Sequence, residues 1–574
     1  MVAHMIKIGY FCIDILQNMP SNRTFIKFSL IFLSFLLAFS CQPKVNPENL
    51  QTDKLTPEAG ATIYGRVMCG DRPLKNVSVS DGVTVVRTGN NGVYNIKSAK
   101  ENGYVFISIP SGYTMAEASL PSAGFWKGLK TKSARPERVD FSLVREDQAQ
   151  STMIVMGDIQ IFSEKSVAEF NDTFIREINK YLPSINMWPV YGLTLGDMTW
   201  DWYWYHGDMI GITNYILAMR KLNGLRVFNT VGNHDNDMQF DSLSEFQATG
   251  EDRTCMDAYR SKLGPTCFSY NISGVHFVSL DDVITTNTGD ITSKDSRGNM
   301  RGVTKYDMQW LKEDLSYVSE DTPVIVSIHI PLFSFRGKPQ KGNADSVNAS
   351  VEEITAPFKK FKNVLFISGH THYLYNIENY DVNGLKVTEW NSGAISGNFW
   401  VPALKGLNLC TDGTPGGYRI LTFQNGRYTS RYKAIGKKAN YMFRAYDRNQ
   451  MNLTTTKITG EIIGEDKNNY VYINVWDYKP SWRITVKEQM ADGSEKNLTA
   501  VKVETYDPLF CLMYENGLTD SGPQLSGTIF RVQASSPATT LTIEVKDEYL
   551  NSSKEIMQRP KTFSIDAYVN EMAE

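Results

Sequence analysis

Five short apolar runs in the middle of this 574-residue chain each lead directly into residues that can bind a metal ion. Runs of this length are typical of buried strands, and the helical segments between them indicate an α/β domain. The runs span residues 153–156, 191–195, 225–231, 324–328 and 364–368. They are followed by Gly157-Asp158-Ile159-Gln160, Gly196-Asp197, Gly232-Asn233-His234-Asp235, His329 and Gly369-His370-Thr371-His372. Because α/β sheets form their sites at the carboxyl ends of strands, we expect these polar residues to meet.

The polar residues at these strand ends form a donor set suited to divalent metal ions. Carboxylate, amide and imidazole groups bind borderline ions such as Mn, Fe or Zn. The candidate ligands are too many for one ion but fit two ions that share a bridging carboxylate: Asp158, Gln160, Asp197, Asn233, His329, His370 and His372. Two such ions bring four positive charges, and the two aspartates with a bridging hydroxide offset three of them. The remaining charge favours a phosphate group, so metal-assisted hydrolysis at phosphorus is the expected chemistry.

The five motifs, taken in this order, resemble those of the calcineurin-like metallophosphoesterases. The resemblance covers roughly residues 150–430 and rests on GD-x-Q, GD-x-x-x-D, GNHD, a lone His and GHTH. It implies an α/β fold, the four-layer αββα sandwich of this family, with a dinuclear metal site. It also implies an active phosphoesterase, because every ligand position carries a competent side chain, while a non-catalytic envelope binding protein is the alternative.

The resemblance divides the ligands between two metals. The first metal is expected to bind Asp158, Gln160 and His372, and the second is expected to bind Asn233, His329 and His370, with Asp197 bridging them. Gln160 replaces the His of the usual D-x-H motif. Its neutral carbonyl oxygen favours harder ions, so Mn is expected over Zn. Some metallophosphoesterases that act on nucleotide diphosphate compounds share this Gln, which keeps a pyrophosphatase as an alternative function.

Three further residues of the motifs are expected to act beside the metals. The resemblance places His234 against the substrate, where it stabilises the transition state or protonates the leaving oxygen. Asp235 is expected to orient the His234 ring and raise its basicity, as suits a general acid. Asp201 is expected to hold a metal ligand through a hydrogen bond.

An aromatic-rich stretch, residues 200–206, follows the bridging candidate Asp197 and is expected at the head of a helix. Because a helix has 3.6 residues per turn, its rings cannot all face one side. Most are expected to pack against the sheet, whereas Trp202, Tyr203 or His206 is expected to line the mouth of the site. Such a ring could stack on a sugar, a base or a lipid headgroup. Two Gly-rich loops, residues 391–400 and 414–418, either shape a pocket or close the domain.

The flanking segments are rich in strand patterns. Residues 60–148 contain alternating apolar positions and turn signals and resemble the small transthyretin-like or carboxypeptidase-regulatory-like β-sandwich. The catalytic domain is predicted to span 149–432, and a C-terminal β-rich domain is predicted for 433–574.

The N-terminal segment has the pattern of an export signal. Basic residues precede an apolar stretch at residues 30–39, and Ser40-Cys41 ends a sequence that resembles a bacterial lipobox. Lipidation of Cys41 would anchor the chain to a membrane, with residues 42–59 as a tether. The expected location is the cell envelope, on the periplasmic side or at the outer membrane. A plain signal peptide and a transmembrane anchor are the alternatives.

Charge and cysteine content limit the partners. The formal net charge is −3 and the chain has no long basic run, which argues against nucleic acid as the main partner. A phosphorylated small molecule or a lipid headgroup is the expected substrate. Outside the first 41 residues, Cys255 and Cys267 are close enough in sequence to form a disulfide, and separate buried thiols are the equal alternative.

Overall fold

The computed structural model describes residues 55–237, 251–287, 297–340, 348–400, 408–453, 467–519 and 521–573. The predicted signal segment, Cys41 and most of the predicted tether lie outside the described residues. The chain divides after Leu55, and the account below concerns the unit Thr56–Glu574. In the part of the chain that is described, no helix has the length and apolar character needed to cross a membrane.

The N-terminal part of this unit is built from two β-sheets. The larger sheet contains β1 (Ile63–Cys69), β2 (Arg72–Pro73), β5 (Val93–Ile96), β7 (Tyr113–Met115), β9 (Glu137–Arg138) and β10 (Phe141–Arg145). The smaller sheet contains β3 (Ser78–Ser80), β4 (Val85–Arg87), β6 (Tyr104–Ile107) and β8 (Trp126–Gly128). Every second residue of β1 from Ile63 to Val67 is buried, as expected when one strand face packs on a core.

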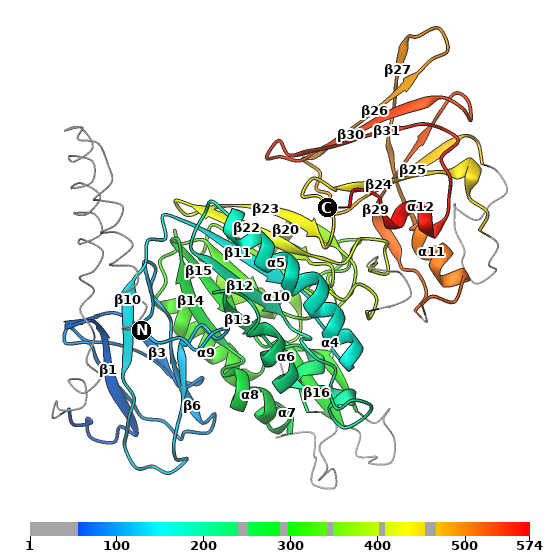
Figure 1. Cartoon of the computed structure of the whole chain (residues 1–574). Helices are drawn as coiled ribbons and strands as arrows, with labels where there is room; N and C mark the ends of the chain where they lie inside the picture. Colours follow the sequence, from blue (N-terminus) through cyan, green and yellow to red (C-terminus); the bar gives the residue numbers. More distant parts are fainter. Residues whose placement is uncertain are drawn as a thin grey trace, which may run out of the picture. The chain divides into compact units, whose positions relative to one another are not determined.

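Two larger sheets form the middle of the chain (Figure 1). The first has the order β13-β12-β11-β22-β23, with β11 (Gln150–Met156), β12 (Val190–Leu195), β13 (Arg226–Thr230), β22 (Gly417–Gln424) and β23 (Arg427–Ala434). The second has the order β14-β15-β18-β19-β21-β20, with β14 (Phe268–Ile272), β15 (Val275–Ser279), β18 (Val324–Ser327), β19 (Val364–Ser368), β20 (Tyr375–Val382) and β21 (Leu385–Asn391). Strands β11, β12 and β13 run parallel, as do β15, β18, β19 and β21. All five predicted strands are present, and each belongs to the parallel part of its sheet.

The first of these sheets is covered on both faces. Ile154 and Met156 of β11 belong to a hydrophobic cluster with residues of four α-helices, among them Phe170. The alternate residues Met153 and Val155 belong to a second cluster, which contains the apolar side chains of the other sheet. A strand buried on both faces shows a continuous apolar run, which explains the pattern in the sequence. One face of this sheet therefore packs on helices and the other on a sheet.

The helices of the middle region lie between the strands in sequence, as the α/β pattern requires. They are α4 (Glu164–Phe170), α5 (Arg176–Tyr181), α6 (Ile212–Met219), α7 (Glu251–Cys255), α8 (Asp257–Leu263), α9 (Lys305–Ser316) and α10 (Val351–Thr355). A π-helical turn, η1 (Asn171–Ile175), joins α4 to α5. The two-stranded sheet of β16 (Val283–Asn287) and β17 (Arg297–Arg301) lies between β15 and α9 in sequence.

The C-terminal part returns to β-structure. One four-stranded sheet contains β24 (Phe443–Asp447), β25 (Tyr470–Val475), β28 (Val501–Tyr506) and β29 (Leu525–Gln533). The other contains β26 (Arg483–Gln489), β27 (Glu495–Leu498), β30 (Thr540–Lys546) and β31 (Ser552–Met557). Helix α11 (Pro508–Glu515) lies between β28 and β29 in sequence, and α12 (Ile565–Val569) follows β31. A buried ion pair of 2.7 Å between Arg419 and Asp477 connects this part to β22.

The alternatives for the cysteines are resolved in favour of separate thiols. No disulfide joins Cys255 to Cys267, and both side chains are buried. The Cys267 sulfur accepts a hydrogen bond from the backbone nitrogen of Asp281 at 3.3 Å. Burial also raises the pKa of the Cys267 thiol well above its usual value, as expected for an unreactive core cysteine.

Candidate metal centre

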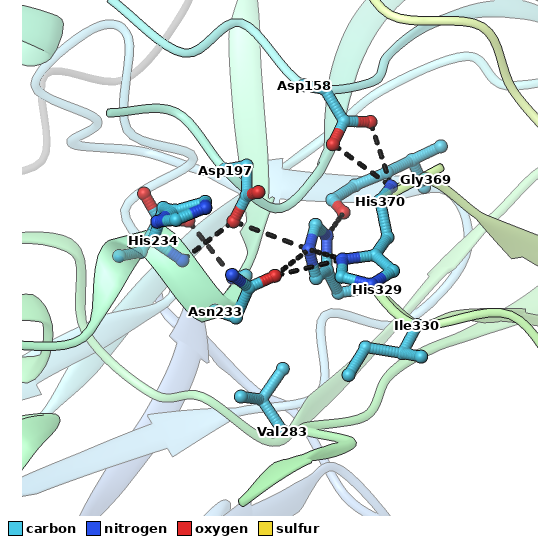
Figure 2. A network of polar contacts seen from close by, with 12 residues as sticks. Asp158, Asp197, Asn233, His234, Val283, His329, Ile330, Gly369 and His370 are labelled. Atoms are coloured by element: carbon cyan, nitrogen blue, oxygen red, sulfur yellow. Dashed lines mark hydrogen bonds and ion pairs between the residues drawn. The ribbon is translucent and has the colours of Figure 1, made fainter. Parts of the chain in front are cut away.

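The ends of the predicted strands meet, and their polar side chains converge (Figure 2). Ligand atoms of Asp197, His329 and His370 all lie within 4.8 Å of one another. The Asn233 amide oxygen lies 2.8 Å from His329 Nε2 and 2.9 Å from His370 Nδ1. The structure therefore brings together four of the residues that the sequence singled out by their place after a strand and by their side-chain type.

His329 shows that the centre is built around a positive charge. Its Nδ1 donates to the backbone oxygen of Leu195 at 2.8 Å, so a neutral ring has a lone pair on Nε2. That nitrogen faces acceptors: the Asn233 oxygen at 2.8 Å and the Asp197 carboxylate at 3.3 Å. Burial lowers the pKa of His329, but the neighbouring Asp197 and its hydrogen bond raise it overall to about 10. Without a metal a proton must occupy the position, and a divalent cation satisfies all of these acceptors.

The first predicted metal position has an orphaned ligand atom. Gln160 donates from Nε2 to Asp197 at 3.1 Å, and its Oε1 is buried without a hydrogen-bond partner in the described structure. His372 donates from Nδ1 to the Gly397 oxygen at 2.8 Å, which points Nε2 toward Asp158 at 3.6 Å. An unpartnered amide oxygen, an imidazole lone pair and a carboxylate are three oxygen and nitrogen donors of the kind that Mn or Zn binds. The residues therefore fit the first metal as well as the second.

The charges of the ligand side chains follow from their environment. Burial raises the pKa of Asp158 to about 6. Burial also acts to raise the pKa of Asp197, but His329 and His234 lower it below its usual value. Burial and the charge of His329 lower the pKa of His370 to about 3, so that this ring is neutral and has a lone pair for a metal.

The backbone at the ligands is held in an uncommon conformation. The candidate ligands with φ in the left-handed region are Asp158 (43°), Gln160 (39°), Asp197 (50°), His370 (71°) and His372 (53°). Each such residue costs about 1–3 kcal/mol and persists where the surrounding structure over-determines it. Clustering of this strain at five ligand positions supports a functional rather than an architectural role.

The glycines of the motifs allow the strand ends to approach one another. A Cβ at Gly196 would lie 2.5 Å from His329 Nδ1, and a Cβ at Gly369 would lie 2.6 Å from Asp158 Oδ2. At Gly232 it would lie 2.2 Å from the Asp197 nitrogen. Any side chain at these positions would force the ligands apart.

We expect Gly232→Ala to lower the free energy of unfolding by about 3 kcal/mol, because the new methyl group overlaps fixed backbone. The change is measured as the shift of the unfolding transition in urea. The matched control is Gly436→Ala: its φ is +70°, but nothing lies within 4 Å of its Cβ, so strain of about 1 kcal/mol is the expected cost. Equal losses in the two variants would contradict the close approach.

The structure changes the roles expected for two carboxylates. His234 Nδ1 contacts Asp201 Oδ1 at 2.7 Å, so Asp201 orients this ring and the expectation that Asp235 does so is wrong. Asp235 instead accepts hydrogen bonds from the backbone nitrogens of Met198, Thr199 and Gly232 at 3.0 to 3.2 Å. His234 and Asp235 are neighbours in the tight turn η4 (Asn233–Asp235), and their side chains point in different directions. Asp235 therefore supports the backbone that follows Asp197.

The electrostatics agree with this assignment. Burial lowers the pKa of His234, but Asp197 and Asp201 raise it above its usual value. Burial and the charge of Asp197 raise the pKa of Asp235 to about 8. His234 therefore has the protonated form of a general acid within reach, whereas Asp235 is largely uncharged at neutral pH.

Asp282 is a supporting residue that the sequence did not reveal. Its buried carboxylate accepts from the backbone nitrogens of His329 at 2.8 Å and Ile330 at 3.0 Å, and burial raises its pKa to about 6. Asp282 follows β15, the strand beside β18, so it fixes the backbone that carries His329. The acidic pair Asp281-Asp282 directly after an apolar strand was the available signal.

The aromatic stretch is a short turn rather than the head of an α-helix. Residues Asp201–Trp204 form the 3-10 turn η3, and α6 begins only at Ile212. Trp202 and His206 stack on each other with centroids 4.0 Å apart. Tyr203 contacts Trp200, whose ring lies 5.2 Å from that of His234. Among the rings of this stretch, Trp200 thus lies next to His234. That Trp202, Tyr203 or His206 lines the mouth of the site stays a prediction.

Comparisons with known proteins identify the family. Three family models match: "N terminal of Calcineurin-like phosphoesterase" over residues 61–146, "Calcineurin-like phosphoesterase" over residues 151–374 and "C terminal of Calcineurin-like phosphoesterase" over residues 389–551. A search of curated proteins found no match.

Two solved structures that match this chain have low sequence identity to it. The phosphopantetheinyl hydrolase of Mycobacterium tuberculosis has 9% identity and a TM-score of 0.22, covering 43% of this chain and 91% of that one. The purple acid phosphatase PPD1 from yellow lupin (Lupinus luteus) seeds has 12% identity and a TM-score of 0.32, covering 62% of this chain and 66% of that one. Similarity this low carries no argument about the site, so the family rests on the three matching models. The chain belongs to the calcineurin-like phosphoesterases and includes the N- and C-terminal domains of that family.

Proposed function

We propose that this phosphoester hydrolase is an exported protein that uses two divalent metal ions, held by the seven predicted ligands, to direct water onto the phosphorus of its substrate. The observation that carries the proposal is His329, whose Nε2 faces two oxygen acceptors while its Nδ1 is occupied by Leu195. A divalent cation would bind this nitrogen and its oxygen neighbours together, and it would give the buried Gln160 oxygen a partner that it lacks in the described structure.

Two ions bound there would supply a hydroxide at neutral pH and would offset the charge of the phosphoryl oxygens. Side chains of this protein would hold the ions and supply the proton for the leaving group. Asp197 lies between the two ligand groups, within 3.1 Å of Gln160 and 3.3 Å of His329, which suits a bridging ligand. Asp201 holds Nδ1 of His234, which leaves Nε2 to protonate the leaving oxygen.

The proposal extends to the architecture and location given by the sequence. We infer that the two central sheets with their helices form the four-layer αββα sandwich of the family. We further infer that residues 60–148 are a transthyretin-like β-sandwich. The lipobox-like segment ending at Cys41 supports an exported lipoprotein on the periplasmic side or at the outer membrane. Radiolabelled palmitate incorporation that Cys41→Ser abolishes is the expected result.

A panel of phosphoesters tests the function. Metal-replete protein is expected to hydrolyse bis-p-nitrophenyl phosphate or p-nitrophenyl phosphate, and Asn233→Ala is expected to lose that activity. Cleavage of nucleotide diphosphate compounds alone would favour the pyrophosphatase alternative. A protein that binds two metals and turns over nothing on the panel would instead be a non-catalytic envelope binding protein.

Gln160 predicts the preferred metal. After chelation, we expect Mn to restore more activity than Zn, because an amide oxygen is a harder ligand than imidazole. Gln160→His is expected to shift both metal content and relative activity toward Zn, measured by mass spectrometry of the bound metals and by rates with each ion. A Zn optimum with inert Mn in the unmodified protein would contradict the prediction.

A further inference from the structure

Four aromatic side chains form a continuous wall beside the metal centre, called here the aromatic wall: Phe162, Trp200, Tyr203 and Phe399. The wall reaches both ends of the site. The Trp200 ring lies 5.2 Å from His234, the Phe399 ring lies 4.8 Å from His372, and the two rings are 5.0 Å apart. Phe162 and Tyr203 pack against Trp200, with ring centroids 5.8 and 5.5 Å from that of Trp200. All four residues are half-buried, so none of them is fully enclosed in the core.

The Phe399 ring is held in place by its loop. Phe399 has a φ of 58° in the left-handed region, an uncommon conformation for an aromatic residue. The adjacent Trp400 donates from its indole nitrogen to the backbone oxygen of Ile159 at 2.7 Å. The Ser396 hydroxyl donates to the backbone oxygen of Asp158 at 2.9 Å. The loop is therefore tied on both sides of Phe399 to the segment that carries Asp158. Strain of this kind persists where the surrounding structure fixes it, and it points to a positioned ring.

The position of the wall relative to His234 indicates which part of a substrate it meets. This step rests on the proposed function, in which hydroxide oxygen bonds to phosphorus while the bond to the leaving oxygen breaks. The electron pair of that bond stays on the leaving oxygen, which takes a proton from His234 Nε2. The leaving group must therefore lie next to His234, and Trp200 is the aromatic neighbour of that ring.

We propose that the aromatic wall binds the leaving group by stacking, and that the substrate is a phosphoester whose leaving alcohol carries an aromatic ring. Aromatic pairs prefer offset-stacked or edge-on contacts with centroids about 4.5–7 Å apart, the spacing already present within the wall. A ring on the substrate would extend this series beside Trp200 and Phe399. Aliphatic chains of equal size gain burial of area but not this geometry.

The test compares two diesters whose leaving alcohols have similar acidity: methyl 2-phenylethyl phosphate and methyl hexyl phosphate. We expect kcat/KM to favour the phenylethyl ester by about three- to tenfold, the range given by one aromatic contact. Trp200→Leu and Phe399→Leu are each expected to bring the ratio close to one, with a much smaller change for the hexyl ester. Tyr306→Leu, which removes a ring that is 63% exposed on α9, is the matched control and should keep the ratio.

A binding measurement separates this inference from the proposed function. The methyl esters of 2-phenylethylphosphonate and hexylphosphonate cannot be hydrolysed at the P–C bond, and calorimetry with metal-loaded protein gives their affinities directly. The phenylethyl compound should bind three- to tenfold more tightly in the unmodified protein and equally in Trp200→Leu. A ratio near one in the unmodified protein overturns the stacking inference, even if both diesters are hydrolysed. The inference would also be overturned if the preference for the phenylethyl compound were lost in Trp202→Leu and kept in Trp200→Leu. That result would show that the stacked pair Trp202 and His206 recognises the ring. Preferential binding without turnover of any phosphoester, monoester or diester, would support the aromatic wall and refute the proposed hydrolysis.

Discussion

Asp197→Asn is expected to lower kcat/KM by about 10³-fold or more and to remove at least one of the two metal ions. Asp197 is the residue that the other groups share: it accepts from the backbone nitrogen of His234 at 2.8 Å and contacts Gln160 and His329. Asparagine keeps the size and one oxygen, but its amide nitrogen has no lone pair for a second metal and would face the Gln160 amide group. The fold should survive, because the substitution is nearly isosteric.

The measurement pairs hydrolysis of bis-p-nitrophenyl phosphate with the metal content of the purified protein. Asp257→Asn is the matched control, since its side chain is 67% exposed on α8. It should leave both quantities unchanged. An Asp197→Asn protein that retains full activity and two metal equivalents would contradict the assignment of Asp197 as the bridging ligand.

The second large effect is expected at Asp201. We expect Asp201→Asn to lower kcat by about 10- to 100-fold without loss of metal, because the orientation and charge of His234 depend on it. Asp197 and Asp201 raise the pKa of His234, and the general acid must be protonated to act. Removing the Asp201 charge lowers that pKa, so the protonated form is lost at a lower pH. The alkaline limb of the kcat profile should therefore move to lower pH.

Asp235→Asn is the comparison variant for this prediction. Its carboxyl group accepts three backbone hydrogen bonds and, with a pKa of about 8, is largely neutral at pH 7. The substitution should lower stability, because its amide nitrogen replaces one accepting oxygen, and it should leave the alkaline limb in place. A shift of that limb in Asp235→Asn, with none in Asp201→Asn, would restore the assignment made from the sequence.

The sequence predicted the strands and the polar residues that converge at their ends, because both are local patterns. Each motif places its polar residues directly after an apolar run. Parallel strands bring their carboxyl ends to one edge of the sheet, and this does not depend on the conformation of the loops. The convergence of Asp197, Asn233, His329 and His370 therefore followed from strand order alone. The glycines at 196, 232 and 369 belong to the same motifs, and the structure adds the reason for them, which is the close approach of the strand ends.

What the sequence could not predict depends on side-chain direction and on distant segments. Asp235 follows His234 directly, yet the η4 turn aims its carboxyl group at the backbone, while Asp201 arrives from another turn. Asp282 reaches His329 through the pairing of β15 with β18, which no motif encodes. Phe399 belongs to a loop 27 residues after His372 in sequence, and its contact with that ring exists only in the folded chain.

Titration of metal-free protein with Mn²⁺ tests the central claim most directly, with bound metal and the rate of phosphodiester hydrolysis measured on the same samples. The account predicts that the rate rises with added metal and saturates when two equivalents are bound per chain, and that Asn233→Ala neither fills both positions nor reaches that rate. Saturation at a single bound equivalent, or two tightly bound ions with no hydrolysis of any phosphoester, would contradict it.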